Sequence, residues 1–289
     1  MFNLTSYLQI KNKQINAMLG QILEKTPSRV AEAMKYSLMA GGKRIRPVLC
    51  IASAETVGGK AEDVLSLACA IEMIHTYSLI HDDLPAMDDD NLRRGKPTCH
   101  VAYDEATAVL AGDALLTLAF EVLSSIRTER HLPDIIRIVA QAAGYKGMIE
   151  GQMRDIASEG ILLEPDELKE IHALKTGAMI EASVVSGAAL GGGTPAQIED
   201  LRIYARNIGL AFQVTDDILN IEGDPEILGK AVGTDENREK NTYPSILGME
   251  KSKSFANDLI NNALKVIDSF DSKSGPLRAI AAYIIERKK

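Results

Sequence analysis

The sequence predicts an all-α fold, a single domain over residues 1–289 that is built from ten or more helices. Apolar residues recur at three- and four-residue spacings almost throughout the chain, which is the period of amphipathic helices. There is no convincing alternation of apolar and polar residues of the kind that forms strands, and β-branched runs are few. No Pro/Gly/Ser-rich linker or long charge run divides the chain, so we expect one core.

Some of the predicted helices carry recognisable start signals. Pro165 stands near the first turn of one helix among acidic residues, which the positive end of the helix dipole favours. Thr194 is the N-cap candidate of another helix, with Pro195 just inside it. The helical period is clearest in residues 65–81, 106–126, 168–190 and 197–221.

Composition and charge argue against several classes of function. The net charge of −8 gives no general field that favours nucleic acid or an anionic membrane surface. The 3 cysteines are widely spaced and lack a CxxC pair, which argues against a disulfide framework or a zinc site and fits a reducing cytosol. The N-terminus has no signal-peptide pattern, and no uninterrupted run of about 18 apolar residues occurs. We therefore expect a cytoplasmic protein without a bilayer-spanning helix.

Residues 82–90, DDLPAMDDD, place five acidic side chains in nine positions after an apolar helix. Because Pro85 removes a backbone donor, the chain must bend there, and the bend can bring Asp88 back beside Asp82. Carboxylates gathered on apolar helices are costly to bury unless they are paired or bind cations. The simple alternative is a solvated acidic turn at the end of a helix.

Asp216 and Asp217 form a second acidic pair inside another strongly helical stretch. Asp216 and Asn220 are one turn apart and share a helix face. Mg²⁺ takes oxygen ligands, keeps several waters and is usually bound by one or two carboxylates plus substrate phosphates. The two clusters together therefore predict magnesium held for a phosphorylated ligand.

Basic clusters complement these acids. The GGKRIRP segment presents Lys43, Arg44 and Arg46 after two glycines that allow close backbone approach to a ligand. Arg93 and Arg94 directly follow the acidic run, and arginine forms bidentate bonds to phosphate oxygens. Any one of these bases alone could be an ordinary surface residue. Further candidates are Lys175, Lys230 and Lys240. Neither a P-loop nor a GxGxxG after a strand occurs, which disfavours a nucleotide fold.

Several motifs together resemble those of the trans-prenyl diphosphate synthases, closest to the short-chain bacterial farnesyl diphosphate synthase type. They follow the family's order over nearly the whole chain and read GGKRIRP, LIHDDLPAMDDDNLRRGKPT, LKTGAMI, FQVTDDILN and EKNTYP. The resemblance implies an all-α domain around a deep central cavity, which forms a homodimer. It implies that an allylic diphosphate, dimethylallyl or geranyl, loses diphosphate and that its carbocation alkylates isopentenyl diphosphate. The cofactor would be Mg²⁺, with Mn²⁺ as an alternative.

The same resemblance assigns roles residue by residue. The metal-binding positions are Asp82, Asp83, Asp88, Asp216 and Asp217. The positions that receive the allylic diphosphate are Arg93, Lys175, Lys230 and Lys240. The isopentenyl diphosphate pocket would contain Lys43, Arg46, His75 and Arg94, and Thr176 and Gln213 would lie beside the developing carbocation. The positions expected to take part in catalysis are Asp82, Asp83, Asp88, Lys175, Thr176, Gln213 and Asp216.

The chain departs from the family pattern at two points. Asn220 stands where the second aspartate motif usually ends in Asp, so it brings an oxygen but no charge. In EKNTYP, Glu239 replaces the glycine that the family commonly has before the lysine. We expect the first departure to tune metal affinity and to leave activity in place. Gly177, which follows Thr176, suits a locally opened helix.

The length of the product is predicted from the helix that carries the first aspartates. At ~1.5 Å per residue, Tyr77 lies roughly 7.5 Å below Asp82, where its ring would form a floor for the growing chain. Tyr77 and Ser78, together with the Pro85–Ala86 insertion, resemble the enzymes that make the C15 product. A geranylgeranyl (C20) synthase is the alternative.

Other hypotheses assign a different function to the same residues. A terpene cyclase shares the aspartate-rich helices but needs no second diphosphate pocket, and GGKRIRP argues against it. An inactive partner subunit would have damaged motifs, and a helical scaffold or repressor would need no paired aspartates. His75 could be a core histidine and Gln213 a satisfied polar group in a helix, and we interpret His81 as structural.

Overall fold

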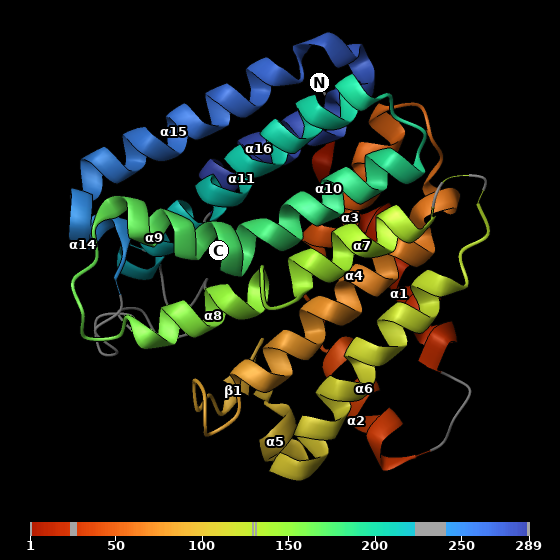
Figure 1. The fold of residues 1–289 in the computed structure, drawn as a ribbon, viewed down its shortest axis with the longest axis vertical. Helices are drawn as coiled ribbons and strands as arrows, with labels where there is room; N and C mark the ends of the chain where they lie inside the picture. The colour runs from red at the N-terminus through yellow and green to blue at the C-terminus, as the bar shows by residue number, and fades with distance from the viewer. Residues whose placement is uncertain (1, 24–27, 129, 131, 223–240, 288–289) are drawn as a thin grey trace.

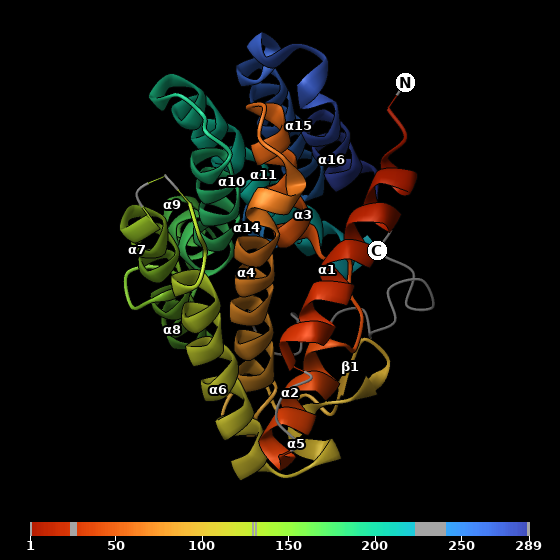
Figure 2. The same ribbon diagram turned by 90° about the vertical axis from the view of Figure 1, so that its right-hand side faces the viewer.

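Helix α4 (Ala61–Asp82) lies in the centre of the molecule, with other helices on both sides of it in two perpendicular views (Figure 1; Figure 2). It is apolar around its whole circumference, which is the pattern of a buried helix, and Leu67, Ile71 and Ile74 are 0% exposed. The computed structural model describes residues 2–23, 28–128, 130, 132–222 and 241–287. Because α4 ends at the first aspartate pair, the core itself positions the acidic cluster.

The first half of the chain packs around α4 and forms one side of the bundle. Helices α3 and α6 lie directly against α4, and α2 and α5 pack against α6 near the end of α4 that carries the aspartates (Figure 2). These elements are α1 (Leu4–Leu23), α2 (Arg29–Leu38), α3 (Ile45–Thr56), α5 (Cys99–Ala102), α6 (Glu105–Ser124) and α7 (Leu132–Ala143).

The second half of the chain completes the bundle and carries the second aspartate pair on its longest described helix, α11. Helix α10 packs against both α3 and α11, and α11 packs along α15 (Figure 1). The elements are α8 (Met148–Ala157), α9 (Pro165–His172), the π-helix η1 (Ala173–Gly177), α10 (Ala178–Leu190), α11 (Pro195–Glu222), α14 (Tyr243–Leu247), α15 (Met249–Val266), the 3-10 helix η2 (Asp268–Ser274) and α16 (Gly275–Glu286). The described residues thus form more than ten helices, which confirms the predicted all-α class.

The start signals read from the sequence operate as predicted. Glu164 caps α9 in a reciprocal capping box with Glu167, and Pro165 is the first residue of the helix. At the start of α11 the Gln197 N–H donates to Thr194 Oγ1 at 3.3 Å, and the Thr194 N–H donates to Gln197 Oε1 at 2.9 Å. Both caps satisfy backbone donors that a helix leaves unpaired at its N-terminus.

One small strand pair was not predicted. Strands β1 (Leu92–Arg93) and β2 (Lys96–Pro97) pair antiparallel just after the acidic run. The two residues between them, Arg94 and Gly95, both have positive φ (54° and 74°), as a two-residue hairpin turn requires. A pair of two-residue strands is too short to show an alternating pattern, so it could not be predicted from the sequence.

Two of the described helices, α4 and α6, are long and apolar enough to cross a membrane when judged by length and composition alone. The most apolar window of α4 is 67% buried inside the protein, as expected for a core helix, whereas that of α6 is 39% buried. Core helices of soluble proteins pass the same test, so these properties are weak evidence for a membrane span. The three cysteines, Cys50, Cys69 and Cys99, are free and buried.

Candidate active site

The first acidic cluster sits on a tight turn at the end of α4. Asp82 is the last residue of the helix, and the chain then turns through Pro85 so that the Asp88 N–H donates to the Asp82 carbonyl oxygen at 2.8 Å. This confirms the predicted bend that returns Asp88 to the vicinity of Asp82. Burial raises the pKa of Asp82 to about 6, and the charge of Lys175 acts in the opposite direction.

Asp83 is held by an arginine of the hairpin. Its side chain is 4% exposed, and Arg93 Nε lies 2.7 and 2.8 Å from its two carboxylate oxygens. Asp83 lines a small cavity of about 30 Å³ together with Tyr36 and Cys99, and Asp82 instead lines the large cavity described below. The neighbouring aspartates therefore face different surroundings, because successive helix positions point about 100° apart.

The second acidic cluster lies on α11, and its members also have partners. Arg287 Nη2 lies 2.6 Å from Asp216 Oδ1, and Asp217 Oδ2 accepts a 2.9 Å hydrogen bond from the Tyr243 N–H at the start of α14. Asn220, the departure in this motif, is 5% exposed. The acids of α11 are thus tied to the C-terminal part of the chain, and the lining of neither cavity described below includes them.

A cavity of about 430 Å³ opens beside the first aspartates. Tyr77 and Ser78 of α4 line it below Asp82, as predicted from the helix geometry, and Tyr77 is 6% exposed. Apolar residues of α8 and of the acidic turn make up much of the remaining wall: Met87, Met148, Ile149, Met153 and Ile156. A cavity with a carboxylate near one end and apolar walls below suits an amphipathic ligand.

The wall opposite α4 contains the locally opened helix that Gly177 suggested. Residues Ala173–Gly177 form a π-helix, a conformation that is rare and often found at functional sites. Within it Thr176 is 8% exposed and lines the large cavity, as does Lys175. Lys175 Nζ donates to Asp155 Oδ2 of α8 at 2.7 Å. The structure thus brings Asp82, Lys175 and Thr176 to one cavity, as predicted.

A second, cationic cavity of about 270 Å³ lies next to the first. Lys43, Arg46, His75 and Arg94, the four residues predicted to form a second diphosphate pocket, all line it. Gly42 (φ 118°) lies against the Arg94 guanidinium, where a Cβ atom would collide with it, and Arg94 Nη1 donates to the Gly41 carbonyl oxygen. The glycines of GGKRIRP therefore serve a close approach of side chain to backbone.

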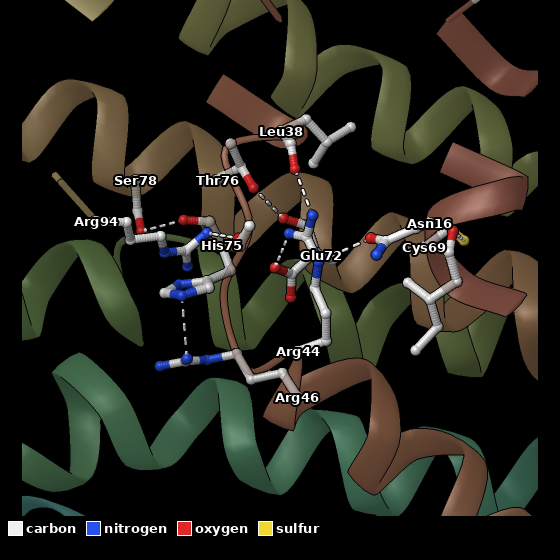
Figure 3. Close-up of polar contacts among 12 residues, drawn as sticks. Asn16, Leu38, Arg44, Arg46, Cys69, Glu72, His75, Thr76, Ser78 and Arg94 are labelled. Atoms are coloured by element: carbon white, nitrogen blue, oxygen red, sulfur yellow. Dashed lines mark hydrogen bonds and ion pairs between the residues drawn. The ribbon is translucent and has the colours of Figure 1, made fainter. Parts of the chain in front are cut away.

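Arg46 and His75 line both cavities and thus stand where the two meet. Arg46 Nη1 lies 3.3 Å from His75 Nε2 (Figure 3). Burial, reinforced by the charges of Arg46 and Arg94, lowers the pKa of His75 well below its ordinary value, so the ring is neutral. Because a guanidinium can only donate, His75 Nε2 accepts and its proton is on Nδ1.

The interpretation of His81 as structural is consistent with its contacts. His81 Nε2 lies 3.0 Å from the Val109 carbonyl oxygen of α6, and its ring packs where Gly112 has no side chain. Its other face meets Tyr77 edge-on, with ring centroids 5.7 Å apart. His81 also lines the large cavity, so it supports the ring of Tyr77 from the side.

Other predicted residues lie outside these two cavities or outside the described residues. Gln213 is half-buried on α11, one turn before Asp216, and the lining of neither cavity includes it. Lys230 and Lys240 fall in residues 223–240, which lie outside the described part of the chain. The chemical roles predicted for these three residues, like those predicted for the other site residues, stay predictions.

Residues that the sequence reasoning missed also line the site. Gln152 of α8 lines the large cavity, and both polar atoms of its amide are buried without a hydrogen-bond partner among the described residues. Asp155, one turn further along the same helix, holds Lys175. Gln152 and Asp155 could have been found from the sequence, because they are polar residues three positions apart on one face of α8. Glu72 and Arg287 were also missed, because nothing in their local sequence shows what they contact.

The carboxylates of the site supply oxygen atoms, the ligand type that hard divalent cations prefer. Within the described residues no group of three or more His, Cys, Asp or Glu side chains is placed to hold a metal ion by itself. A site with so few protein ligands fits a cation whose remaining ligands are water and substrate phosphate oxygens. Such a cation would depend on substrate for tight binding.

Comparisons with known proteins agree with this arrangement. The polyprenyl synthetase family model matches residues 27–276. The chain is 49% identical to a chloroplastic geranylgeranyl pyrophosphate synthase of Capsicum annuum, over 99% of this chain and 79% of that protein. It is 46% identical to the farnesyl diphosphate synthase of Micrococcus luteus, over 95% of each chain. A solved FPP/GFPP synthase from Zymomonas mobilis superposes with a TM-score of 0.88 at 38% identity, over 98% of this chain and 99% of that one. With two adjoining cavities that share Arg46 and His75, and with these relatives along nearly its whole length, the chain belongs to the polyprenyl synthetase family and is a trans-prenyl synthase.

Proposed function

We propose that the protein is a farnesyl diphosphate synthase, which condenses dimethylallyl or geranyl diphosphate with isopentenyl diphosphate. One observation carries the two-substrate reaction: an acid-flanked apolar cavity and a cationic cavity adjoin at Arg46 and His75. A terpene cyclase has a single diphosphate substrate and no use for the second cavity. The motifs in the described residues are intact apart from Asn220, which speaks against an inactive partner subunit.

In this reaction the allylic C–O bond breaks and its electron pair leaves with diphosphate. The carbocation at C1 then takes the π electrons of isopentenyl diphosphate to form the new C–C bond. Loss of a proton from the neighbouring carbon creates the new double bond. No described side chain is placed as an obvious base, and the released diphosphate is the expected proton acceptor.

The protein's own groups orient the substrates and exclude water. Lys175 lines the large cavity and its charge acts on Asp82, and Thr176 lines the same wall. An oxygen dipole in a dry cavity stabilises a cation and is held too firmly to attack it. Arg46, Arg94 and Lys43 would hold the diphosphate of isopentenyl diphosphate in the second cavity.

Magnesium, with manganese as a substitute, fits this donor set. When bound, Mg²⁺ neutralises diphosphate charge and improves the leaving group. The residues that would hold it are Asp82, Asp83, Asp88, Asp216 and Asp217. Of these, Asp83 and Asp216 are paired with arginines, so binding at those oxygens requires the arginines to shift or to share them.

The C15 product is proposed from the floor of the large cavity. Tyr77 places a ring in its wall below Asp82 and is braced by His81. A specific observation favours the C20 product as the second candidate, since relatives at 49% identity carry the name geranylgeranyl pyrophosphate synthase. The size of the space below Tyr77 decides between the two.

A homodimer is also proposed, with α6 as its contact. Val109 and Leu110 are 40% and 54% exposed on this helix, and its most apolar 18-residue window is only 39% buried within the protein. Helix α6 also supports the Tyr77–His81 pair, so an interface there would lie close to the cavity floor. Size-exclusion chromatography with light scattering would give twice the 31.3 kDa chain mass for a dimer.

The experiment that tests the function incubates the purified protein with Mg²⁺, labelled isopentenyl diphosphate and each allylic starter in turn. The products are dephosphorylated and sized by chromatography. A dominant C15 alcohol that disappears with chelator supports the proposal, and a C20 alcohol supports the second candidate. No incorporation with any starter would contradict both.

A further inference from the structure

Arg44 adopts a backbone conformation that needs an explanation. It directly precedes α3 and has φ 53° and ψ 36°, in the left-handed region that disfavours residues with a Cβ atom. Gly41 and Gly42, just before it, adopt positive φ without this penalty. Strain of this kind persists only where other contacts of the same residue offset it.

The side chain of Arg44 provides such contacts on three sides (Figure 3). Nη1 donates to Glu72 Oε1 at 2.6 Å, Nη2 to the Leu38 carbonyl oxygen at 2.5 Å, and Nε to Asn16 Oδ1 at 3.2 Å. These partners belong to α4, α2 and α1, so one guanidinium joins the start of α3 to three other helices. The side chains of the ion pair are 1% and 2% exposed.

The ion pair joins two walls of the cationic cavity. On one side of Arg44 the chain presents Lys43, and two residues further it presents Arg46. On the other side, Glu72 lies three residues before His75 on α4, which places both on the same helix face. Arg44 and Glu72 themselves line the cavity from behind, so a change in the pair moves both walls.

Charge gives the pair a second effect on the cavity. Its lining contains four basic side chains, and Glu72 is the one carboxylate among them. Burial and the charge of Arg94 lower the pKa of Arg46, whereas Glu72 raises it. Arg46 Nε is buried and has no hydrogen-bond partner in the described part of the chain, as expected for a donor kept for an anion.

From this geometry we propose that Arg44, through its ion pair with Glu72, is a positioning residue for the diphosphate of isopentenyl diphosphate. The pair sets the distance between the Lys43–Arg46 segment and His75, and Glu72 offsets part of the repulsion among the cavity cations. The inference rests on the proposed function, since it assigns the cationic cavity to that substrate. It adds a residue whose guanidinium is held by Glu72, Leu38 and Asn16 and which acts on the substrate through the ion pair.

A purely structural ion pair would change stability and would leave substrate affinities alone. The discriminating measurement is therefore the KM for isopentenyl diphosphate compared with the KM for geranyl diphosphate. For Glu72→Gln we expect the first KM to rise at least tenfold and the second to change less than threefold. The geranyl diphosphate site keeps Asp82 and Lys175, which the substitution does not touch.

A single substitution leaves a buried charge unpaired and can prevent folding. The second variant is therefore the double substitution Arg44→Met with Glu72→Leu, which replaces the pair by apolar side chains of similar size. Circular dichroism and thermal melting establish that it folds. We expect the same selective rise in the KM for isopentenyl diphosphate. A folded double variant with the wild-type KM would overturn the proposal.

The matched control is another ion pair between helices of the same bundle. Lys11 Nζ of α1 lies 2.5 Å from Glu55 Oε1 of α3, with side chains 10% and 27% exposed, and neither residue lines the cationic cavity. Lys11→Met with Glu55→Leu should leave both KM values within threefold. An equal rise in the KM for isopentenyl diphosphate in this control would also overturn the proposal.

Calorimetry with inorganic diphosphate in the presence of chelator separates this inference from the proposed function. Without divalent cations, binding depends on the cationic cavity, and we expect the Arg44→Met, Glu72→Leu variant to bind at least tenfold more weakly than wild type. Failure of the wild type to consume isopentenyl diphosphate, with this difference intact, would reject the proposed function alone. Equal diphosphate affinity in both proteins, or no binding by the wild type, would reject the positioning role.

Discussion

Arg287 and Asp216 of α11 form an ion pair, with Arg287 Nη2 2.6 Å from Asp216 Oδ1. The Arg287 side chain is 3% exposed, and it also donates to the Phe212 carbonyl oxygen at 2.9 Å and packs over the Phe212 ring. A residue that follows the last helix thus neutralises a carboxylate predicted to bind metal. A guanidinium and a divalent cation compete for the same oxygen.

Removing this competitor should strengthen metal binding. We expect Arg287→Gln, which keeps an amide donor for Phe212 but removes the charge, to lower the Mg²⁺ concentration for half-saturation by roughly three- to tenfold, about 0.7–1.4 kcal/mol. The measurement is a thermal-shift titration of Mg²⁺ at fixed inorganic diphosphate. Arg278→Gln, which breaks the ion pair between Arg278 of α16 and Asp268 of η2, is the control and should leave the titration unchanged. Equal or weaker Mg²⁺ binding by Arg287→Gln would contradict the competition.

Tyr77 should limit the length of the product. Because its ring lines the cavity below Asp82, we expect Tyr77→Ala to shift the products toward C20 and longer chains. Tyr77→Phe is the matched control, since it keeps the ring and removes only a buried hydroxyl that has no hydrogen-bond partner among the described residues. The products are sized by chromatography after dephosphorylation. An unchanged spectrum for Tyr77→Ala would remove Tyr77 as the floor.

Removal of the divalent metal should abolish most of the stabilisation of the protein by diphosphate. At about 100 times its Kd, a ligand adds about 2.7 kcal/mol to the free energy of unfolding, which raises the melting temperature of a 289-residue chain by roughly 4–5 °C. We expect Mg²⁺ with diphosphate to produce such a shift, EDTA to abolish most of it and Asp82→Asn to reduce it. The same shift in EDTA would show that the acidic clusters do not act through metal.

Acid should destabilise the protein through its buried histidines. Burial lowers the pKa of His172 to about 4, from an ordinary value of 6.5, so in this window the unfolded chain binds a proton that the folded one does not. The free energy of unfolding therefore falls as the pH drops from 6.5 to 4, by ~1.4 kcal/mol per pH unit for this histidine. Protonation of His75, whose pKa is also lowered, adds to the slope.

Urea unfolding at several pH values measures this slope. His172→Leu removes one of the two buried histidines whose pKa is lowered, so the free energy of unfolding should fall less steeply as the pH drops from 6.5 to 4. The comparison uses the slope, because lost packing against Tyr243 also changes the absolute stability. A slope identical to that of the wild type would show that His172 does not titrate as its burial requires.

Local sequence signals accounted for the helices and for the main outline of the site. Pro85 correctly predicted the return of Asp88 toward Asp82, because a proline restricts the chain wherever it occurs. Gly177 correctly indicated the opened helix beside Thr176. Such inferences succeed because they depend on residues within one or two turns of each other.

Partners from distant parts of the chain could not be predicted in this way. The orientation of Asp83 toward Arg93 depends on a hairpin of two-residue strands, and the role of Glu72 depends on the left-handed conformation of Arg44. The polar face of α8 was visible, but nothing local shows that Asp155 meets Lys175. Each of these contacts forms only when helices far apart in the chain are packed together.

The amino-acid sequence alone is thus sufficient to predict the helical class, the turn that groups the first aspartates, the set of charged groups and the family. Periodicity, capping and backbone restriction act over a few residues, so they can be read directly from the chain. Packing decided which acids are paired with arginines, that two cavities meet at Arg46 and His75, and that the Arg44–Glu72 pair lies behind one of them. Those features depend on burial and on distances between helices, which only the assembled core defines.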